Sequence, residues 1–352
     1  MATKRKTKQT EVVKSVKKTK ETRSAPEVNL TPAGWSHHPV LGMTTPSLEK
    51  RTMPWFGWVG LAILLASEFM LYTGSHPVAI AFTPIMWTGY ILLLDGWVWQ
   101  RGGRSYFIDR KREWPMLFLI SVLLWSMFEV INFKTRTWHY KNIPPLGLRE
   151  FLGAWAYGTI IPALFRTWDL FATFKFFDKA PVLHVKFTPF KLALSFVIGI
   201  TSIGLPILMS DKWANLLIPC IWLGFIFLVE PINYLLKIPR ISIFRQLEMG
   251  NTRLLWQLLA AGLFCGVIWE SFNGEAAKAG GLIWVYTLAD FWKAMSFNIY
   301  PIRNDSMPLA GFGCYPPFIW ENFVMYELIK YAMQGDKMWK SSHETSDSGS
   351  MN

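Results

Sequence analysis

Charged residues, histidine and cysteine are all scarce in this chain of 352 residues. Only 17% of the residues are charged, whereas 51% are hydrophobic, and the three cysteines show no Cys-x-x-Cys spacing. Isolated cysteines of this kind are packing residues, and they neither favour nor exclude a disulfide. The six histidines include no two placed within apolar segments that would be neighbours, which argues against a bis-histidine haem site.

Several catalytic motifs are also missing. The sequence has no His-x-x-x-His or His-x-x-His series of a di-iron lipid desaturase, and no Glu-x-x-His of a di-iron bundle. It has no Walker A motif, no Gly-x-Ser-x-Gly and no paired aspartates of the kind that bind prenyl diphosphates. The sequence therefore indicates no metal site and identifies no cofactor.

What the chain has instead is apolar residues in long blocks. A helix needs roughly 20 apolar residues to cross the hydrocarbon core of a bilayer, and blocks of about that length recur along the sequence. They predict an all-α polytopic membrane bundle. We expect about eight spans, at 55–73, 78–99, 115–133, 151–174, 189–209, 214–236, 254–272 and 309–332.

The distribution of lysine and arginine predicts the orientation of the bundle. Positive charge is concentrated in the N-terminal arm and in three loops, 100–114, 175–188 and 237–253. By the positive-inside rule these segments and both termini are cytoplasmic. The loop 134–150 holds four basic residues and opposes this orientation, but four basic segments outweigh one.

The two ends of the chain differ from its apolar middle. Residues 1–23 contain nine lysines and arginines against two glutamates. A segment so polar and so uniformly charged cannot bury a core, and we expect a disordered cytoplasmic arm over 1–53. Beside a membrane it would be attracted to anionic lipid headgroups, at about 1 kcal/mol for each basic residue near the surface. We expect no nucleic-acid partner, and we expect a second polar tail over 336–352.

Two acidic motifs recur in the same order along the chain. An acidic residue, Asp95 or Glu230, ends an apolar run six residues after a glycine. A Glu-x-x-Asn ends the next run, 34 or 40 residues later. A Trp-x-Tyr and a Pro-Leu follow each Glu-x-x-Asn. We predict two four-span repeats, 54–188 and 189–335, in parallel orientation about an axis along the membrane normal.

Three stretches of the second half form a characteristic succession: Cys265–Asn273 (CGVIWESFN), Trp284-Val-Tyr-Thr287 and Met307–Phe318 (MPLAGFGCYPPF). This succession resembles a family of bacterial multi-pass membrane proteins without an established activity. The resemblance covers roughly residues 55–335 and does not include the basic arm. It implies the architecture and a location in the bacterial inner membrane, and it implies no reaction.

The repeated glutamates are the candidate catalytic residues. Glu129 and Glu270 each lie three residues before an asparagine, which places both side chains on one helix face. A desolvated carboxyl can act as a general acid, and an amide beside it can donate a hydrogen bond to it. The alternative is that these pairs join neighbouring helices. The candidate substrate-binding residues are Asn132, Asn273, Glu321, Trp138, Tyr140, Trp284 and Tyr286.

The other two repeated acids have a different predicted role. Asp95 and Glu230 lie at the predicted cytoplasmic ends of their spans, close in sequence to Arg101, Arg104 and Lys237. We therefore expect them to anchor the cytoplasmic loops by salt bridges.

Three functions are compatible with these features. The first is binding or processing of an apolar molecule (a lipid, a quinone or an isoprenoid) between the halves near the outer leaflet. The second is a transporter or channel, and the third is a scaffold subunit of a membrane complex. The hydrophobicity, the 16% aromatic content and the lack of a polar pathway favour the first. Whether the protein is an enzyme is not decided by the sequence.

Overall fold

The computed structural model describes residues 51–236, 242–287, 289–293 and 309–334. The first 50 residues of the predicted arm and the whole predicted polar tail lie outside the described residues. Within them, six helices are long and apolar enough to cross a membrane: α2 (Trp55–Tyr72), α3 (His76–Gln100), α4 (Glu113–Thr135), α6 (Pro189–Leu208), α8 (Ile218–Leu235) and α10 (Arg253–Lys278). The chain is a multi-pass helical membrane protein, and these helices coincide with six of the predicted spans.

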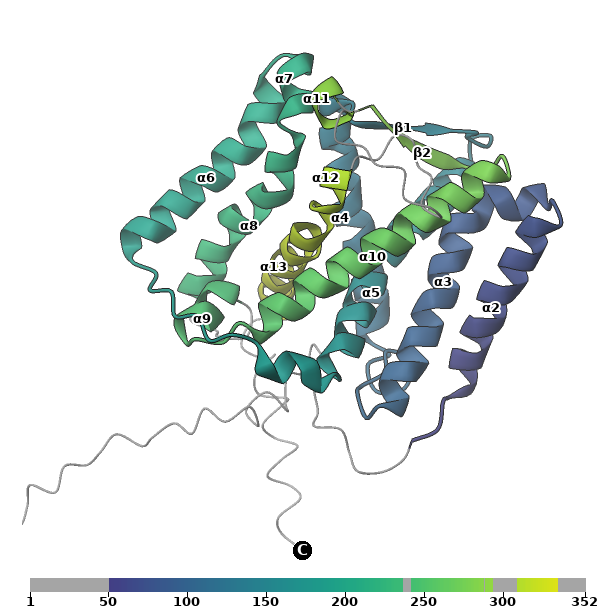
Figure 1. Cartoon of the computed structure of the whole chain (residues 1–352), viewed down its shortest axis with the longest axis horizontal. Coiled ribbons are helices and arrows are strands. Elements are labelled where there is room, and N and C mark those ends of the chain that lie inside the picture. The colour runs from purple at the N-terminus through teal and green to yellow at the C-terminus, as the bar shows by residue number, and fades with distance from the viewer. Residues whose placement is uncertain (1–50, 237–241, 288, 294–308, 335–352) are drawn as a thin grey trace, which may run out of the picture. The chain divides into compact units, whose positions relative to one another are not determined.

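The other two predicted spans coincide with long helices of a different character. These are α5 (Leu148–Ala172) and α13 (Tyr315–Gln334), which lie in the middle of the bundle (Figure 1). Every residue of α5 from 158 to 170 is buried, including Arg166 and Asp169. Neighbouring helices cover such segments, so their buried polar side chains can pair with protein groups and need not be apolar. This explains why these two helices are not among the six that are apolar enough to cross a membrane by composition alone.

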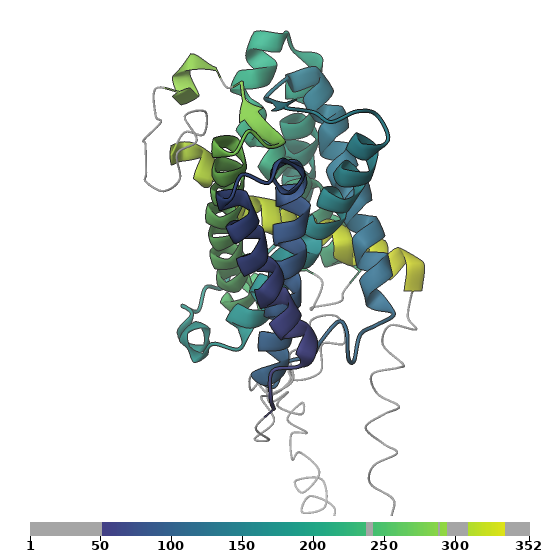
Figure 2. The same ribbon diagram turned by 90° about the vertical axis from the view of Figure 1, so that its right-hand side faces the viewer.

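Two helix pairs have close backbone contacts that depend on glycine. In Figures 1 and 2, α2 runs alongside α3, and Figure 1 shows α6 beside α8. A Cβ atom at Gly60 of α2 would lie 2.5 Å from the carbonyl oxygen of Gly89 on α3. A Cβ atom at Gly199 of α6 would lie 2.4 Å from the backbone nitrogen of Leu228 on α8. Small residues of this kind let membrane helices approach each other closely.

A short ribbon joins two helices that are far apart in sequence. Strands β1 (Trp138–Lys141) and β2 (Ile283–Tyr286) pair in antiparallel orientation, with Trp138 opposite Tyr286 and Tyr140 opposite Trp284. They follow α4 and α10, so the ribbon brings the C-terminal ends of these two helices together at one end of the bundle (Figure 1). The sequence predicted these residues as loops.

Short helices complete the described part of the chain: η2 (Lys175–Lys179), α7 (Asp211–Leu216), α9 (Ile243–Glu248), α11 (Asp290–Lys293) and α12 (Leu309–Phe312). Helices α7 and α11 lie near the ribbon end of the bundle, whereas η2 and α9 lie at the opposite end (Figure 1). Helices α11 and α12 contribute residues to the cavity described below, and α9 begins at the loop held by Glu230.

Candidate functional site

Glu129 is surrounded by aromatic hydrogen-bond donors. Its Oε1 atom accepts hydrogen bonds from the Tyr140 hydroxyl at 2.5 Å, the Trp125 indole at 3.0 Å and the Trp138 indole at 3.2 Å. Trp125 lies one turn earlier on α4, and the other two donors come from β1. The ribbon therefore folds back over the end of α4 and satisfies its carboxyl group.

Glu270 has the same kind of surroundings in the second half of the chain. It is fully buried on α10 and accepts hydrogen bonds from the hydroxyls of Tyr286 at 2.8 Å and Tyr315 at 2.5 Å. The Trp284 indole donates to the Tyr286 oxygen at 3.2 Å. Tyr286 thus corresponds to Tyr140, because each is the tyrosine of a Trp-x-Tyr and donates to its own glutamate.

The two predicted asparagines fix the strands. The Asn132 amide donates to the Trp138 carbonyl at 2.9 Å and accepts from the Trp138 N–H at 3.1 Å. The Asn273 amide donates to the Trp284 carbonyl at 2.9 Å and accepts from the Trp284 N–H at 3.1 Å. Both amides use both of their polar atoms on the backbone of the ribbon. Each asparagine therefore holds the strand whose tryptophan and tyrosine lie near the glutamate of the same Glu-x-x-Asn motif.

A cavity of about 550 Å³ lies inside the bundle next to the ribbon. Its lining includes four of the predicted site residues, namely Trp138, Tyr140, Trp284 and Tyr286. Among the described residues, Glu129, Glu270, Asn132, Asn273 and Glu321 are not part of the lining. The aromatic lining residues are Trp87, Trp125, Trp138, Trp222, Trp269, Trp284, Trp292, Trp320, Tyr140, Tyr157, Tyr286, Tyr315 and Phe318. Four of the predicted site residues therefore line one aromatic cavity, and the other five lie outside its lining.

The ribbon tyrosines remain hydrogen-bond donors over the ordinary pH range. Burial, with the nearby Glu129 carboxyl, raises the pKa of Tyr140 well above 10. Burial, with the nearby Glu270 carboxyl, raises the pKa of Tyr286 in the same way. Because the hydroxyls of Tyr140 and Tyr286 both keep their protons, each tyrosine is the donor and its glutamate carboxyl is the acceptor.

Glu321 differs from the other two glutamates. It is fully buried on α13, and neither carboxyl oxygen has a hydrogen-bond partner among the described residues. Trp320 beside it and Cys314 seven residues earlier both line the cavity. Glu321, a predicted substrate-binding residue, therefore lies outside the cavity lining, although residues near it in the sequence belong to that lining.

Sequence reasoning missed several lining residues, including Trp87, Trp125, Trp269 and Tyr315. Trp125 had a readable signal, because it lies four residues before Glu129 and so shares its helix face. Tyr315 had none, because it precedes Pro316 at the start of α13 and reaches Glu270 from 45 residues away. The rings form a continuous wall, in which the Trp125 and Trp269 centroids lie 5.6 Å apart.

Asp95 and Glu230 anchor loops at the end of the bundle away from the ribbon. Asp95 accepts hydrogen bonds from the Ser105 hydroxyl and, at 2.8 Å, from the Tyr106 N–H. Glu230 accepts from the Ser242 hydroxyl at 2.8 Å and the Ile243 N–H at 2.9 Å. Each acid therefore holds a serine and the backbone N–H that follows it. The expected anchoring role agrees with these contacts.

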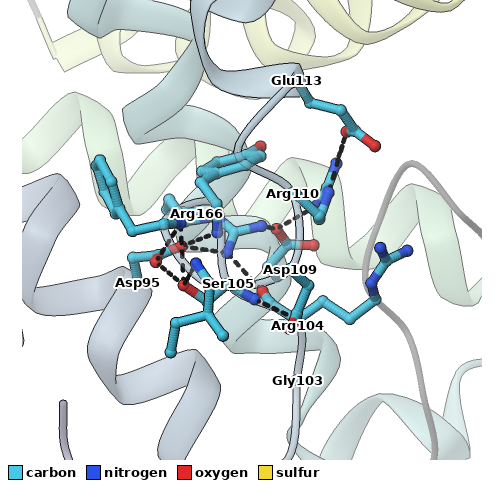
Figure 3. A network of polar contacts seen from close by, with 12 residues as sticks. Asp95, Gly103, Arg104, Ser105, Asp109, Arg110, Glu113 and Arg166 are labelled. Atoms are coloured by element: carbon cyan, nitrogen blue, oxygen red, sulfur yellow. Dashed lines mark hydrogen bonds and ion pairs between the residues drawn. The ribbon is translucent and has the colours of Figure 1, made fainter.

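The expected salt-bridge partners differ from the observed ones. Asp95 pairs with Arg166 of α5, whose guanidinium lies 2.7 Å from the carboxylate and 3.7 Å from the centre of the Tyr106 ring (Figure 3). Arg101 instead donates to the Thr173 hydroxyl at 2.6 Å, and the Arg104 backbone carbonyl accepts from Arg166 at 2.8 Å. Sequence proximity pointed to the loop arginines, whereas the packing of α5 supplies a cation from 71 residues away.

Glu230 has a neutral partner in place of an arginine. The Trp320 indole of α13 donates to it at 3.1 Å. Lys237, the partner expected from the sequence, lies outside the described residues.

Comparison with known proteins gives no assignment. No protein-family model, no curated protein and no solved structure matches the chain. Within the described residues, no group of three or more histidine, cysteine, aspartate or glutamate side chains is arranged to hold a metal ion.

Proposed function

We propose that this membrane protein binds an apolar small molecule in the aromatic cavity beside the ribbon. The observation that carries the proposal is the cavity itself, which has a volume of about 550 Å³ and a lining made largely of tryptophan and tyrosine. Small-molecule sites typically measure about 300–1,000 Å³ and combine apolar walls with a few placed polar groups. The tyrosine hydroxyls of the ribbon are polar groups of this kind.

In this proposal Glu129 and Glu270 are positioning residues. Each carboxyl is bonded to a tyrosine that lines the cavity, whereas the carboxyl itself does not line it. The glutamates fix the direction of the hydroxyls, and Asn132 and Asn273 fix the strands that carry them. A proton exchanged between a bound molecule and either carboxyl would pass through Tyr140, Tyr286 or Tyr315, which all line the cavity. A lipid, a quinone or an isoprenoid would fit the apolar walls.

The proposed architecture is a pair of four-span repeats, with α5 and α13 as the fourth spans. Its support is the matched pairs of contacts, in which Glu129 and Tyr140 correspond to Glu270 and Tyr286. The ribbon adds support because Trp138 faces Tyr286 and Tyr140 faces Trp284. Trp138 of β1 thus faces the equivalent of Tyr140, and Tyr140 faces the equivalent of Trp138. This arrangement is produced by a two-fold axis through the centre of the ribbon. Such an axis along the membrane normal relates parallel repeats.

The proposed orientation places both termini and the loop anchors in the cytoplasm and the ribbon on the outer side. The basic loops at the anchor end support it through the positive-inside rule. The resemblance noted above favours a bacterial inner membrane. Anionic lipid headgroups are proposed partners of the basic arm, which lies outside the described residues.

The proposal is tested by mass spectrometry of organic extracts from the purified full-length protein. We expect an apolar molecule that is absent from extracts of a control membrane protein. Ala156 lines the cavity from α5, so Ala156→Phe fills part of it. Overpacking costs about 1–3 kcal/mol, and 1.4 kcal/mol corresponds to about a tenfold loss of bound molecule.

Ala154→Phe is the matched control, because Ala154 lies on the same helix and is exposed. The control should retain the bound molecule at the wild-type level. An extract without any enriched molecule, or equal loss in both variants, would contradict the proposal.

A further inference from the structure

Two polar side chains on α3 line the cavity and have no hydrogen-bond partner among the described residues. These are Thr83 and Trp87, which stand four residues apart and therefore share one helix face. The Trp87 Nε1 and Thr83 Oγ1 atoms are buried, and neither has a hydrogen-bond partner among the described residues. The Trp87 side chain is only 1% exposed. Native structures seldom leave such groups unpaired, so each requires an explanation.

No other buried threonine hydroxyl or indole of the described residues lacks a hydrogen-bond partner. Other threonine hydroxyls within helices, at Thr88 and Thr167, donate to the carbonyl four residues earlier, at 2.7 and 2.8 Å. Other indoles of the cavity donate to protein oxygens, namely those of Trp125, Trp138, Trp284, Trp292 and Trp320. Within the described residues, Thr83 and Trp87 are therefore the one threonine and the one tryptophan whose buried polar side-chain atom has no hydrogen-bond partner.

We propose that Trp87 and Thr83 together bind one carbonyl oxygen of the apolar ligand; this inference rests on the proposed function. An indole N–H only donates, so the ligand group that faces it must be an acceptor. A carbonyl oxygen has two lone pairs and accepts from both side chains, and unlike an alcohol it adds no further donor. The ligand class is therefore an apolar ketone or quinone.

The walls near the pair suit a flat ring that carries this oxygen. The Trp87 ring contacts the Trp269 ring at 5.6 Å and the Phe272 ring at 5.2 Å between centroids. Aromatic rings favour offset or edge-to-face contacts at such separations, and a conjugated ring in the cavity extends the same packing. The α3 pair thus supplies the polar contact, and the rings supply the apolar ones.

The experiment compares two probes of nearly equal shape, 2-methyl-1,4-naphthoquinone and 2-methylnaphthalene. Binding to the detergent-solubilised full-length protein is measured by equilibrium dialysis against protein-free micelles. Thr83→Val and Trp87→Phe each remove one donor and keep most of the shape. We expect each change to weaken quinone binding about three- to tenfold, the effect of one neutral hydrogen bond, and to change hydrocarbon binding less than about twofold.

Two matched controls keep the tested pair intact. Trp58→Phe replaces an indole on α2 that is 60% exposed, and Thr201→Val replaces an exposed threonine on α6. Both should leave the binding of either probe unchanged. The carbonyl stretch of the bound quinone, measured by infrared difference spectroscopy, should lie below its value in micelles and return toward it in Thr83→Val.

The outcomes separate the two proposals. Quinone binding that depends on both donors supports the carbonyl assignment. Binding of both probes that neither variant alters overturns the assignment and leaves the apolar cavity as a binding site. Binding of neither probe above the micelle background overturns the assignment and the proposed function together. If Trp87→Phe does not fold, Thr83→Val and the infrared shift decide the result.

Discussion

Asp95 and Glu230 each anchor the same type of loop, but their partners on the central helices differ in charge. Asp95 and Glu230 are both fully buried, and each binds a serine hydroxyl and the N–H that follows. Asp95 also meets the Arg166 cation, whereas Glu230 meets the neutral Trp320 indole. The geometry of the anchor is thus common to both halves, while the way its charge is compensated differs. In each half, hydrogen bonds between the acid and the loop fix the position of the loop. The residue supplied by the central helix, Arg166 of α5 or Trp320 of α13, determines whether the acid meets a cation.

The first anchor belongs to a larger group of buried charges. Arg166 also pairs with Asp169, and Arg110 lies 3.8 Å from the same carboxylate. Arg110 lies 2.6 Å from Glu113 as well (Figure 3). Removing a buried cation that compensates two carboxylates leaves both of them uncompensated. They then repel each other in an apolar environment. The second anchor has the same number of donors among the described residues, but all four donors to Glu230 are neutral, so no single cation holds it.

The largest expected effect is therefore that of Arg166→Met. The change leaves Asp95 without its cation, and breaking a buried pair on one side typically costs about 3–5 kcal/mol. We expect a loss of this size in the free energy of unfolding, measured by denaturant titration in detergent with tryptophan fluorescence. The folded yield should fall in parallel.

Two further variants show whether charge compensation is the cause. The double variant Asp95→Asn with Arg166→Met should recover part of the loss, because the uncompensated carboxylate is gone. Arg149→Met removes an exposed arginine of the same helix, which pairs with Glu150 at its surface, and should change stability by less than about 0.5 kcal/mol. A double variant as unstable as Arg166→Met alone would show that lost packing, and not charge, explains the effect.

An intermediate loss of stability is expected from substitutions at the two glycine contacts, between α2 and α3 and between α6 and α8. Gly60→Ala and Gly199→Ala each place a methyl group against the backbone of the neighbouring helix. Overpacking of this kind costs about 1–3 kcal/mol, and we expect losses of similar size in the two halves in the same unfolding assay. Gly204→Ala on α6 is the control, because no atom lies within 4 Å of the added carbon. It should leave stability equal or raise it by up to about 1 kcal/mol. A large loss in only one of the two tested variants would show that the halves pack differently.

The sequence predicted those features that depend on short spacings. Apolar blocks located the helices, and the repeated Glu-x-x-Asn and Trp-x-Tyr motifs identified the residues that converge beside the ribbon. The chain distance between Asn132 and Trp138 is only six residues, so a motif of this length can encode the contact.

Features that depend on packing across the bundle were not predictable in the same way. The partner of Asp95 lies 71 residues away on a helix whose neighbours alone decide which side chain reaches the anchor. Strands of four residues, paired across more than 140 positions, leave no periodic pattern that distinguishes them from loops. The role of the asparagines also depended on the ribbon, because their amides bind strand backbone.

The smallest expected effect is that of Glu230→Gln, and it tests the comparison of the two anchors most directly. A glutamine keeps one oxygen that accepts from Ser242 or Ile243, while its amide NH₂ cannot accept from the remaining donors. Leaving one buried donor unpaired costs about 1–3 kcal/mol, and removal of a buried acidic group without a cationic partner among the described residues offsets part of it. We expect a net loss of about 1 kcal/mol in the unfolding assay. Asp95→Asn should cost more, because it removes one of the two carboxylates that pair with the fully buried Arg166. Equal losses for the two neutral variants would mean that the loop hydrogen bonds dominate both anchors and that Arg166 contributes little to the difference between them.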